Sequence, residues 1–297
     1  MPPPIIEVDN LVKKYGEATA VDNISFTVSE GLFFGFLGPN GAGKTTTMRI
    51  LATLLKKTSG SVTVAGFDVD RRPDDVRRAI GFAMQDISLD NLASGYENLQ
   101  LLGVLYGLTP AQSRARAGEL LETVGLSKVA ERWVNSYSGG MRRRLDLAGV
   151  LMHSPRILFL DEPTQGLDPQ ARRTIWDHLR ALNKEGSTIF LTTHYMDEAD
   201  ILCDTLAFID QGKIVCHGTP QGLKDEMGGN IVTLRFQPTV SLDAVRSVLQ
   251  STFGSDAVIT TKDQDVQVTS HHAEETLPRM IQDLNATGLA PLSLSVS

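Results

Sequence analysis

The stretch that most constrains the fold reads Gly38-Pro39-Asn40-Gly41-Ala42-Gly43-Lys44-Thr45. It fits the phosphate-binding pattern GxxxxGKS/T and lies between a strand-like run, residues 32–37, and a helical pattern that starts at Thr46. In such a loop the glycines let backbone N–H groups curl around anionic oxygens, and the helix N-terminus adds a favourable dipole. We expect Lys44 to reach the terminal phosphates of a nucleotide and the Thr45 hydroxyl to ligate Mg²⁺. The sequence therefore predicts that residues 38–46 bind the phosphates of a nucleotide.

A second motif is the apolar run at residues 157–160, which is preceded by Arg156 and followed by Asp161 and Glu162. A buried strand of a parallel sheet presents its ligands at its carboxyl end, as this pattern predicts. Asp161 is expected to hold Mg²⁺ through water, and Glu162 to polarise the water that attacks the γ-phosphate. Taken alone, such a run is also typical of a strand that stops at a turn, here at Pro163.

A third motif, Tyr137-Ser138-Gly139-Gly140-Met141, lies between the first two and precedes a helical pattern. The three motifs together resemble the ABC ATPase family, in which they are called Walker A, signature and Walker B. Three further matches appear in the order of the family: Gln85 as the Q-loop residue, Gly166-Leu167-Asp168 as the D-loop and His194 as the switch residue. Tyr15 stands where the family stacks an aromatic residue on adenine.

The resemblance implies a role for each of these residues. Gln85 contacts Mg²⁺ or the attacking water and reports to a membrane partner, and His194 contacts the γ-phosphate. Ser138 and Gly140, with the N-terminus of the helix that follows, cap a γ-phosphate bound to the opposite protomer. Gly139 and Asp168 also belong to the expected nucleotide-binding residues. Because the chain has one P-loop and one signature, it needs a second chain, most simply a copy arranged head to tail in an ATP-dependent homodimer.

The form of the signature indicates which group of ABC ATPases this sequence most resembles. Tyr137 and Met141 replace the commoner Leu and Gln, Leu32 replaces a frequent acidic residue, and residues 142–148 read Arg-Arg-Arg-Leu-Asp-Leu-Ala. This form looks like the ATPases of daunorubicin-resistance-type drug and antibiotic exporters. The resemblance implies an ATPase at the cytoplasmic face of the cell membrane that powers efflux of a drug, antibiotic or lipid-like compound through a separate permease. The three arginines are expected on a solvated or interdomain helix face.

Composition limits the alternatives. The chain has 297 residues, 41% of them hydrophobic and 21% charged, which is typical of a globular protein with one large domain and a small appendage. The net charge of −7 argues against a nucleic-acid partner, because phosphate backbones are bound by clustered Lys and Arg. The apolar runs are too short to cross a membrane, so any membrane role is expected to depend on another chain. Cys203 and Cys216 are expected to be reduced structural thiols.

The order of patterns predicts an α/β fold. Apolar runs alternate with helical patterns up to about residue 220, which indicates a mostly parallel sheet, and residues 88–152 carry helical periodicity alone, which indicates an inserted helical subdomain. After a Gly-rich break at residues 227–230, the patterns read βαββαβ, a small ferredoxin-like unit. We therefore predict an ATPase cassette at residues 1–226 and an α+β domain at residues 227–297, with an assembly or regulatory role.

Two other functional classes remain open at this stage. Relatives that act in translation or on DNA usually carry tandem cassettes, long coiled-coil insertions or basic surfaces, and this sequence shows none of these. An importer ATPase whose ferredoxin-like tail binds a regulatory ligand is the other alternative, and the form of the signature disfavours it. Trp133 and Trp176 are interpreted as packing anchors.

Overall fold

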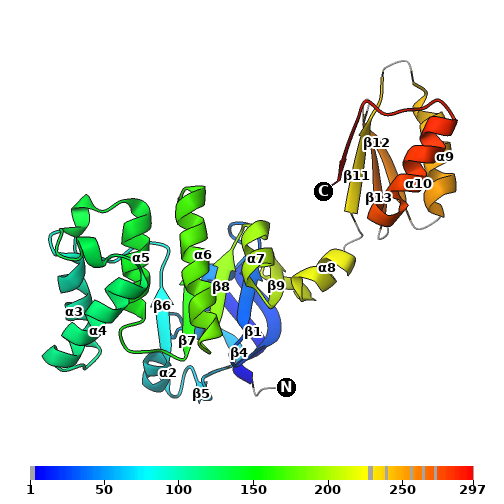
Figure 1. The fold of residues 1–297 in the computed structure, drawn as a ribbon. Helices are drawn as coiled ribbons and strands as arrows, with labels where there is room; N and C mark the ends of the chain where they lie inside the picture. Colours follow the sequence, from blue (N-terminus) through cyan, green and yellow to red (C-terminus); the bar gives the residue numbers. More distant parts are fainter. Residues whose placement is uncertain are drawn as a thin grey trace. The chain divides into compact units, whose positions relative to one another are not determined.

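The computed structural model describes residues 4–226, 230–237, 240–254, 257–262, 265–270 and 273–296 (Figure 1). Residue contacts divide the chain into two compact units, Met1–Pro220 and Gln221–Ser297, whereas the sequence predicts a boundary after residue 226. Of the predicted Gly-rich break at residues 227–230, residues 227–229 lie outside the described residues. The elements up to the unit boundary are β1 (Pro4–Tyr15), β2 (Ala18–Ser29), β3 (Phe33–Leu37), α1 (Lys44–Leu51), β4 (Ser59–Val64), β5 (Phe67–Asp68), α2 (Pro73–Ala79), β6 (Ile80–Ala83), α3 (Gly95–Leu105), α4 (Pro110–Thr123), η1 (Ser127–Val129), η2 (Val134–Ser136), α5 (Gly139–Val150), β7 (Ile157–Asp161), α6 (Pro169–Lys184), β8 (Thr188–Thr193), α7 (Met196–Leu202), β9 (Thr205–Asp210), β10 (Lys213–Gly218) and α8 (Pro220–Glu226).

The central sheet of the first unit has six strands in the order β10-β9-β3-β8-β7-β6. All neighbouring strands are parallel except β9 and β10, which confirms the predicted mostly parallel sheet. β3, β7 and β8 are buried along their whole length, which explains why their sequences are continuous apolar runs. Because parallel strands end at the same edge, the segments that follow β3, β6, β7 and β8 meet there.

A second, antiparallel sheet with the order β2-β1-β4-β5 is a finding that the sequence patterns did not predict. Its long strands mix buried with exposed residues, as expected for a sheet with one covered face. The covered face shares one apolar core with the central sheet, and α1 contacts strands of both sheets. In this core the ring of Phe26 lies 5.6 Å from the rings of Phe34 and Phe36.

Helices α3, α4 and α5 form the predicted helical insert between β6 and β7, and they gather at one end of the first unit (Figure 1). α3 and α4 each begin with a capping box, at Ser94 and at Thr109, which satisfies backbone N–H groups of the first turn. Trp176 is buried as predicted, but Trp133 is 60% exposed because its segment, just before η2, lies at the surface of the insert. Within the described residues we find no helix with the length and apolar character needed to span a membrane.

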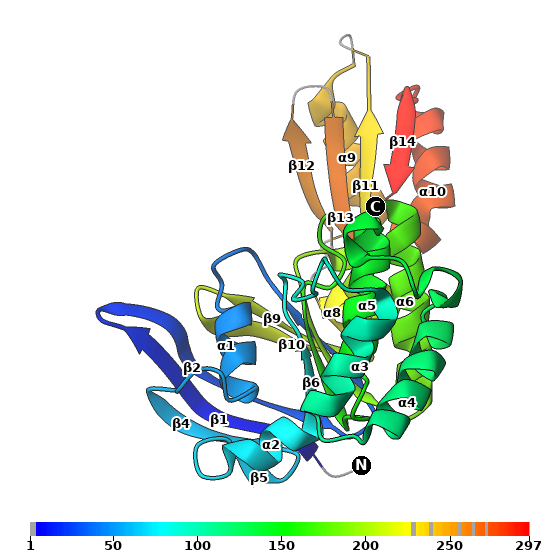
Figure 2. The same ribbon diagram turned by 90° about the vertical axis from the view of Figure 1, so that its left-hand side faces the viewer.

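The second unit is the predicted βαββαβ fold (Figure 2). Its sheet has the order β12-β13-β11-β14, with antiparallel neighbours, and its two helices contact one face of the sheet. Inward-facing residues of the sheet, such as Val232 and Val268, form the core with Met280 and Leu284. This order and the helices on one face confirm the ferredoxin-like prediction. The elements are β11 (Asn230–Arg235), α9 (Leu242–Phe253), β12 (Val258–Lys262), β13 (Asp265–Ser270), α10 (Ala273–Ala286) and β14 (Ser293–Val296).

Candidate functional site

The predicted P-loop connects β3 to α1 at the carboxyl edge of the central sheet. Two of its positions admit only glycine. A Cβ atom on Gly38 would lie 2.1 Å from the carbonyl oxygen of Ile209, and one on Gly43 would lie 2.6 Å from that of Ala20. Gly43 also has φ 108°, a conformation that side chains disfavour. The loop is therefore packed closely against β9 and β2, with its backbone free to face a ligand.

Lys44, the first residue of α1, is buried and points back across the loop. Its Nζ donates hydrogen bonds to the carbonyl oxygens of Gly38 (2.7 Å) and Pro39 (3.0 Å) and lies 3.4 Å from Oε1 of Glu162. The cavity beside it has a volume of about 290 Å³. Its lining residues are Ala20, Asn40, Gly41, Gly43, Lys44, Thr45, Thr46, Gln85, Glu162 and Gln165. The ammonium of Lys44 thus contacts both the P-loop and the acidic residue that follows β7.

Asp161 ends β7 and is almost fully buried. Its Oδ1 accepts hydrogen bonds from the hydroxyls of Thr45 (3.1 Å) and Thr192 (2.5 Å). The sequence prediction included the first of these threonines but missed the second, which lies at the carboxyl end of β8. Thr192 could have been predicted as a polar residue near the end of a buried strand, because buried polar side chains are almost always hydrogen-bonded.

Glu162 follows in the left-handed backbone conformation, with φ 46°. For a residue other than glycine this costs about 1–3 kcal/mol and persists only where the surroundings hold it. Its N–H donates to the carbonyl oxygen of Thr192 (3.1 Å), and its carboxylate lies between Lys44 and Nδ1 of His194, which is 3.1 Å from Oε2. The two predicted catalytic residues Glu162 and His194 are therefore in direct contact.

Gln85 follows β6 and lines the same cavity, where its amide donates a hydrogen bond to the side chain of Gln165. Gln165 is a second residue that the sequence prediction missed. Tyr15 is not among the residues that line the cavity. The ring of Tyr15 is half exposed, and the ammonium of Lys13 lies over it, 4.8 Å from the ring centroid. The structure thus gathers the P-loop, Asp161, Glu162, Gln85 and His194, but not Tyr15.

The predicted signature lies at a different cavity, of about 320 Å³. Ser138 is the N-cap of α5, and its Oγ accepts a hydrogen bond from the N–H of Met141 (3.3 Å). Asp168 caps α6 in the same way through the N–H of Ala171 (2.9 Å). The lining residues are Ser138, Gly139, Gly140, Met141, Arg144, Gly166, Leu167, Asp168, Gln170, Ala171 and Thr174. Since none of these lines the P-loop cavity, the predicted nucleotide-binding residues form two separate halves within one chain.

A family model described as ABC transporter matches residues 21–165. The daunorubicin/doxorubicin resistance ATP-binding protein DrrA of Streptomyces peucetius is 43% identical over 293 residues, which are 98% of this chain and 88% of that protein. The linearmycin resistance ATP-binding protein LnrL of Bacillus subtilis is 36% identical over 298 residues, with 98% and 94% covered. The chain belongs to the ABC transporter family.

Solved structures of ABC cassettes agree with this assignment. The dimeric ATP-binding cassette MJ0796 in a post-hydrolysis state with ADP and phosphate superposes with a TM-score of 0.66 at 28% identity, covering 72% of this chain and 98% of that one. The cassette CbiO1 of Clostridium perfringens, part of an ABC transporter complex, gives a TM-score of 0.70 at 28% identity, covering 82% and 94%. The first unit is therefore an ATP-binding cassette of this family.

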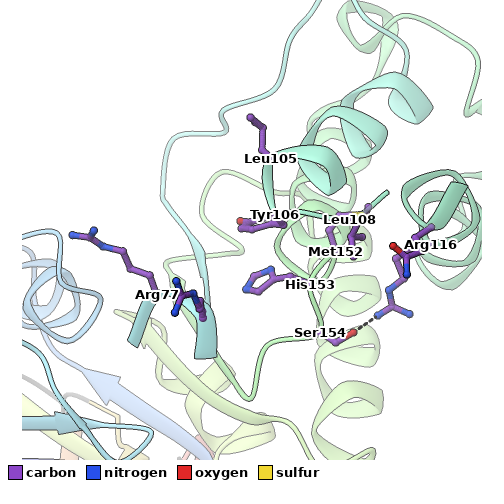
Figure 3. A pocket seen from close by; sticks show the side chains of 10 residues that line it. Arg77, Leu105, Tyr106, Leu108, Arg116, Met152, His153 and Ser154 are labelled. Carbon is purple, nitrogen blue, oxygen red and sulfur yellow. Dashed lines mark hydrogen bonds between the residues drawn. The ribbon is translucent and has the colours of Figure 1, made fainter. Parts of the chain in front are cut away.

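A third cavity of the ABC cassette, of about 690 Å³, was not predicted from the sequence (Figure 3). Its lining comes from α2, α3, α4 and the segment after α5. The rings of Tyr106 and His153 stack with centroids 4.1 Å apart, and Arg116 donates a hydrogen bond to Oγ of Ser154 (3.3 Å). Burial lowers the pKa of His153, which favours its neutral form. Leu105 at the rim is 72% exposed, so this cavity combines apolar and basic surfaces.

Proposed function

We propose that this chain is the ATP-hydrolysing subunit of an ABC exporter and works as a head-to-tail pair of identical copies. The separation of the P-loop half from the signature half carries the proposal. Lys44 and Ser138 of one chain line different cavities, so we infer that a phosphate bound at Lys44 does not meet Ser138 of the same chain. A second copy turned head to tail supplies the missing half to each site.

We assign a role to each of the site residues, supported by its contacts where the structure shows them. The N–H groups of the P-loop and the ammonium of Lys44 bind the phosphates, which take over the hydrogen bonds that Lys44 now makes to loop carbonyls. Glu162 orients and polarises the attacking water, and His194, in contact with its carboxylate, holds that side chain toward the γ-phosphate. Gln85 lines the same cavity and positions the water or the metal. Tyr15 does not line this cavity, and its proposed stacking on adenine rests on the family resemblance alone.

The residues also fit a Mg²⁺ ion. The hydroxyl oxygen of Thr45 and Oδ1 of Asp161 lie 3.1 Å apart, and Mg²⁺ prefers such oxygen ligands. Gln85 adds an amide oxygen from the same cavity. When bound, Mg²⁺ neutralises charge on the phosphate oxygens.

The partner is a separate integral membrane permease, and the location is the cytoplasmic face of the cell membrane. The names of the relatives, which describe resistance to daunorubicin, doxorubicin and linearmycin, favour efflux of a drug, antibiotic or lipid-like compound. The cavity of Figure 3 suits a short amphipathic helix of the permease, because Leu105 and Tyr106 offer exposed apolar surface and Arg77 and Arg116 line the same cavity. We expect Leu105→Glu to abolish stimulation of the ATPase by the permease.

For the C-terminal domain, residues 227–297, we propose a role in assembly, either of the dimer or with the permease. It has its own apolar core, and within the described residues no group of three or more His, Cys, Asp and Glu could hold a metal. A chain truncated at Gly228 that still forms the complex and transports would contradict this role. A thermal shift of the isolated domain with a metabolite would support a regulatory role instead.

The experiment that tests the proposed function is Mg²⁺-dependent ATPase activity of the purified chain, with and without a candidate permease in lipid. Lys44→Ala and Glu162→Gln are each expected to lower the rate by about 100-fold or more, because each removes a group that acts on the transferred phosphate. The permease is expected to stimulate the wild type. An unchanged rate in Glu162→Gln would contradict the mechanism, and indifference to every permease would contradict the transport role.

A further inference from the structure

Arg143, the middle residue of the run 142–144, is buried where the helical insert meets the central sheet. It is 5% exposed, whereas Arg142 and Arg144 are partly exposed and donate hydrogen bonds within the insert, to the carbonyl oxygens of Asn135 and Val124. The predicted solvated or interdomain face is therefore wrong for Arg143, which lies in the interior of the first unit. Burial lowers the pKa of its guanidinium, and the nearby charge of Asp146 opposes this.

The guanidinium of Arg143 donates hydrogen bonds to three backbone carbonyls outside its own helix. Nε donates to Pro163 (2.8 Å), Nη2 to Asp161 (3.3 Å) and Nη1 to Met84 (2.6 Å). The first two carbonyls flank Glu162, and the third directly precedes Gln85. Nη1 also donates to Oδ2 of Asp146 (3.1 Å), one turn further along α5, which pairs the buried charge.

The hydrogen bonds of Arg143 restrain the backbone on both sides of Glu162. Its left-handed conformation is disfavoured for a side-chain-bearing residue, so it requires support from its neighbours. Arg143 holds the carbonyl oxygens of Asp161 and Pro163, the residues before and after Glu162, with one rigid planar group. A lysine at this position could not do the same, because its ammonium is a single point at the end of a flexible chain.

We propose that Arg143 is a positioning residue that holds the backbone of Glu162 and the start of the Gln85 segment to the signature helix of the same chain. This inference rests on the proposed function, in which Glu162 orients the attacking water. Since α5 begins at the cap Ser138, Arg143 links the half of the site that faces the partner's nucleotide to the carboxylate that acts on the chain's own nucleotide.

The test is Arg143→Lys, with Arg142→Lys as the matched control on the same helix. We expect kcat of Arg143→Lys to fall about 10- to 100-fold, because small misplacements of a catalytic group cost up to about 100-fold. KM for ATP should change less than about 2-fold, because Arg143 does not touch the P-loop. Hydrogen exchange should become faster at the amides of Glu162, Gln165 and Leu167, which bond within or next to the held segment. The control should match the wild type in all three measurements.

The outcomes separate the two proposals. A wild type without ATPase activity, or one unaffected by Glu162→Gln, contradicts the proposed function, and the exchange measurement then still decides whether Arg143 holds the segment. With an active wild type, Arg143→Lys that keeps the wild-type kcat, or leaves exchange at these amides unchanged, overturns the role of Arg143. If this variant does not fold, Arg143→Gln combined with Asp146→Asn avoids a buried unpaired charge, and the same expectations and contradictions apply to it.

Discussion

The two halves of the nucleotide site differ in how far each is complete within one chain. In the P-loop half, three functional side chains contact one another: Lys44 pairs with Glu162, and Glu162 contacts His194. In the signature half, the side chains of Ser138 and Asp168 are used to cap their own helices, and their cavity holds no such catalytic cluster. Under the proposed function, this difference assigns the chemistry to the first half, whereas the second half offers helix N-termini that act only beside a phosphate bound to the partner copy.

The strongest way to break this comparison is to inactivate each half in a different chain. Lys44→Ala removes the phosphate clamp, and Gly139→Asp places a carboxylate where the signature would face a phosphate. The Asp side chain has room, since a Cβ atom there would lie 3.9 Å from Leu167, and an acid in the first turn suits a helix. Each variant alone is expected to lose about 100-fold or more of the ATPase rate.

An equal mixture of the two variants is expected to recover about a quarter of the wild-type rate, because half of the dimers are mixed and each of these holds one intact site. Sedimentation with MgATP gives the matching control on association, with Glu162→Gln as the variant expected to accumulate as a dimer. A mixture as inactive as its components would mean that the halves do not complete each other across two chains. A fully active Gly139→Asp would mean that the signature half binds no phosphate.

A smaller effect is expected at the junction of the two halves. Burial raises the pKa of Asp146 to about 6, against an ordinary value of 3.8, although the charge and hydrogen bond of Arg143 oppose this. The folded protein therefore binds this proton more tightly than the unfolded chain, and the stabilisation present below about pH 4 is lost as the pH rises through about 6. Relative to Asp146→Asn, the wild type should lose about 3 kcal/mol of unfolding free energy between about pH 4 and 7.

Urea denaturation followed by tryptophan fluorescence at several pH values measures this difference. Both tryptophans of the chain, Trp133 and Trp176, lie in the cassette, so the signal reports that unit alone. A difference between the wild type and Asp146→Asn that stays constant over this pH range would contradict the raised pKa.

The sequence predicted features that depend on neighbouring residues, but not those that depend on contacts between distant segments. Motifs with a fixed local geometry were readable, namely the P-loop and the acidic end of β7. Gln85 and His194 were identified only through the family resemblance, by their order among the other motifs. The periodicity of apolar residues gave the parallel sheet, the helical insert and the βαββαβ unit. Contacts between distant segments were not readable. Nothing in three consecutive arginines distinguishes buried Arg143 from its neighbours, because its environment depends on carbonyls about 20 and 60 residues away.

The antiparallel sheet and Thr192 were missed for a related reason. Alternation of buried and exposed residues in β1 and β2 is interrupted by irregular register, so the period of two is weak in the sequence. Thr192 is one threonine among several in β8, and only its place opposite Asp161 in the parallel register makes it part of the site.

The smallest expected effect is on stability and concerns the two tryptophans, both of which the sequence predicted to be packing anchors. Trp176 donates a hydrogen bond from Nε1 to the fully buried carboxylate of Glu198 (2.8 Å), which also accepts one from Thr164 in the turn after Glu162. Trp176→Phe removes a hydrogen-bond donor to a buried acidic side chain and should cost about 2–3 kcal/mol of unfolding free energy. Trp133→Phe should change it by less than about 0.5 kcal/mol, because that ring is largely exposed. Scanning calorimetry of both variants measures the loss of unfolding free energy. Equal losses in the two variants would mean that Trp133 is a packing anchor, as the sequence predicted, and stabilises the cassette as much as Trp176 does.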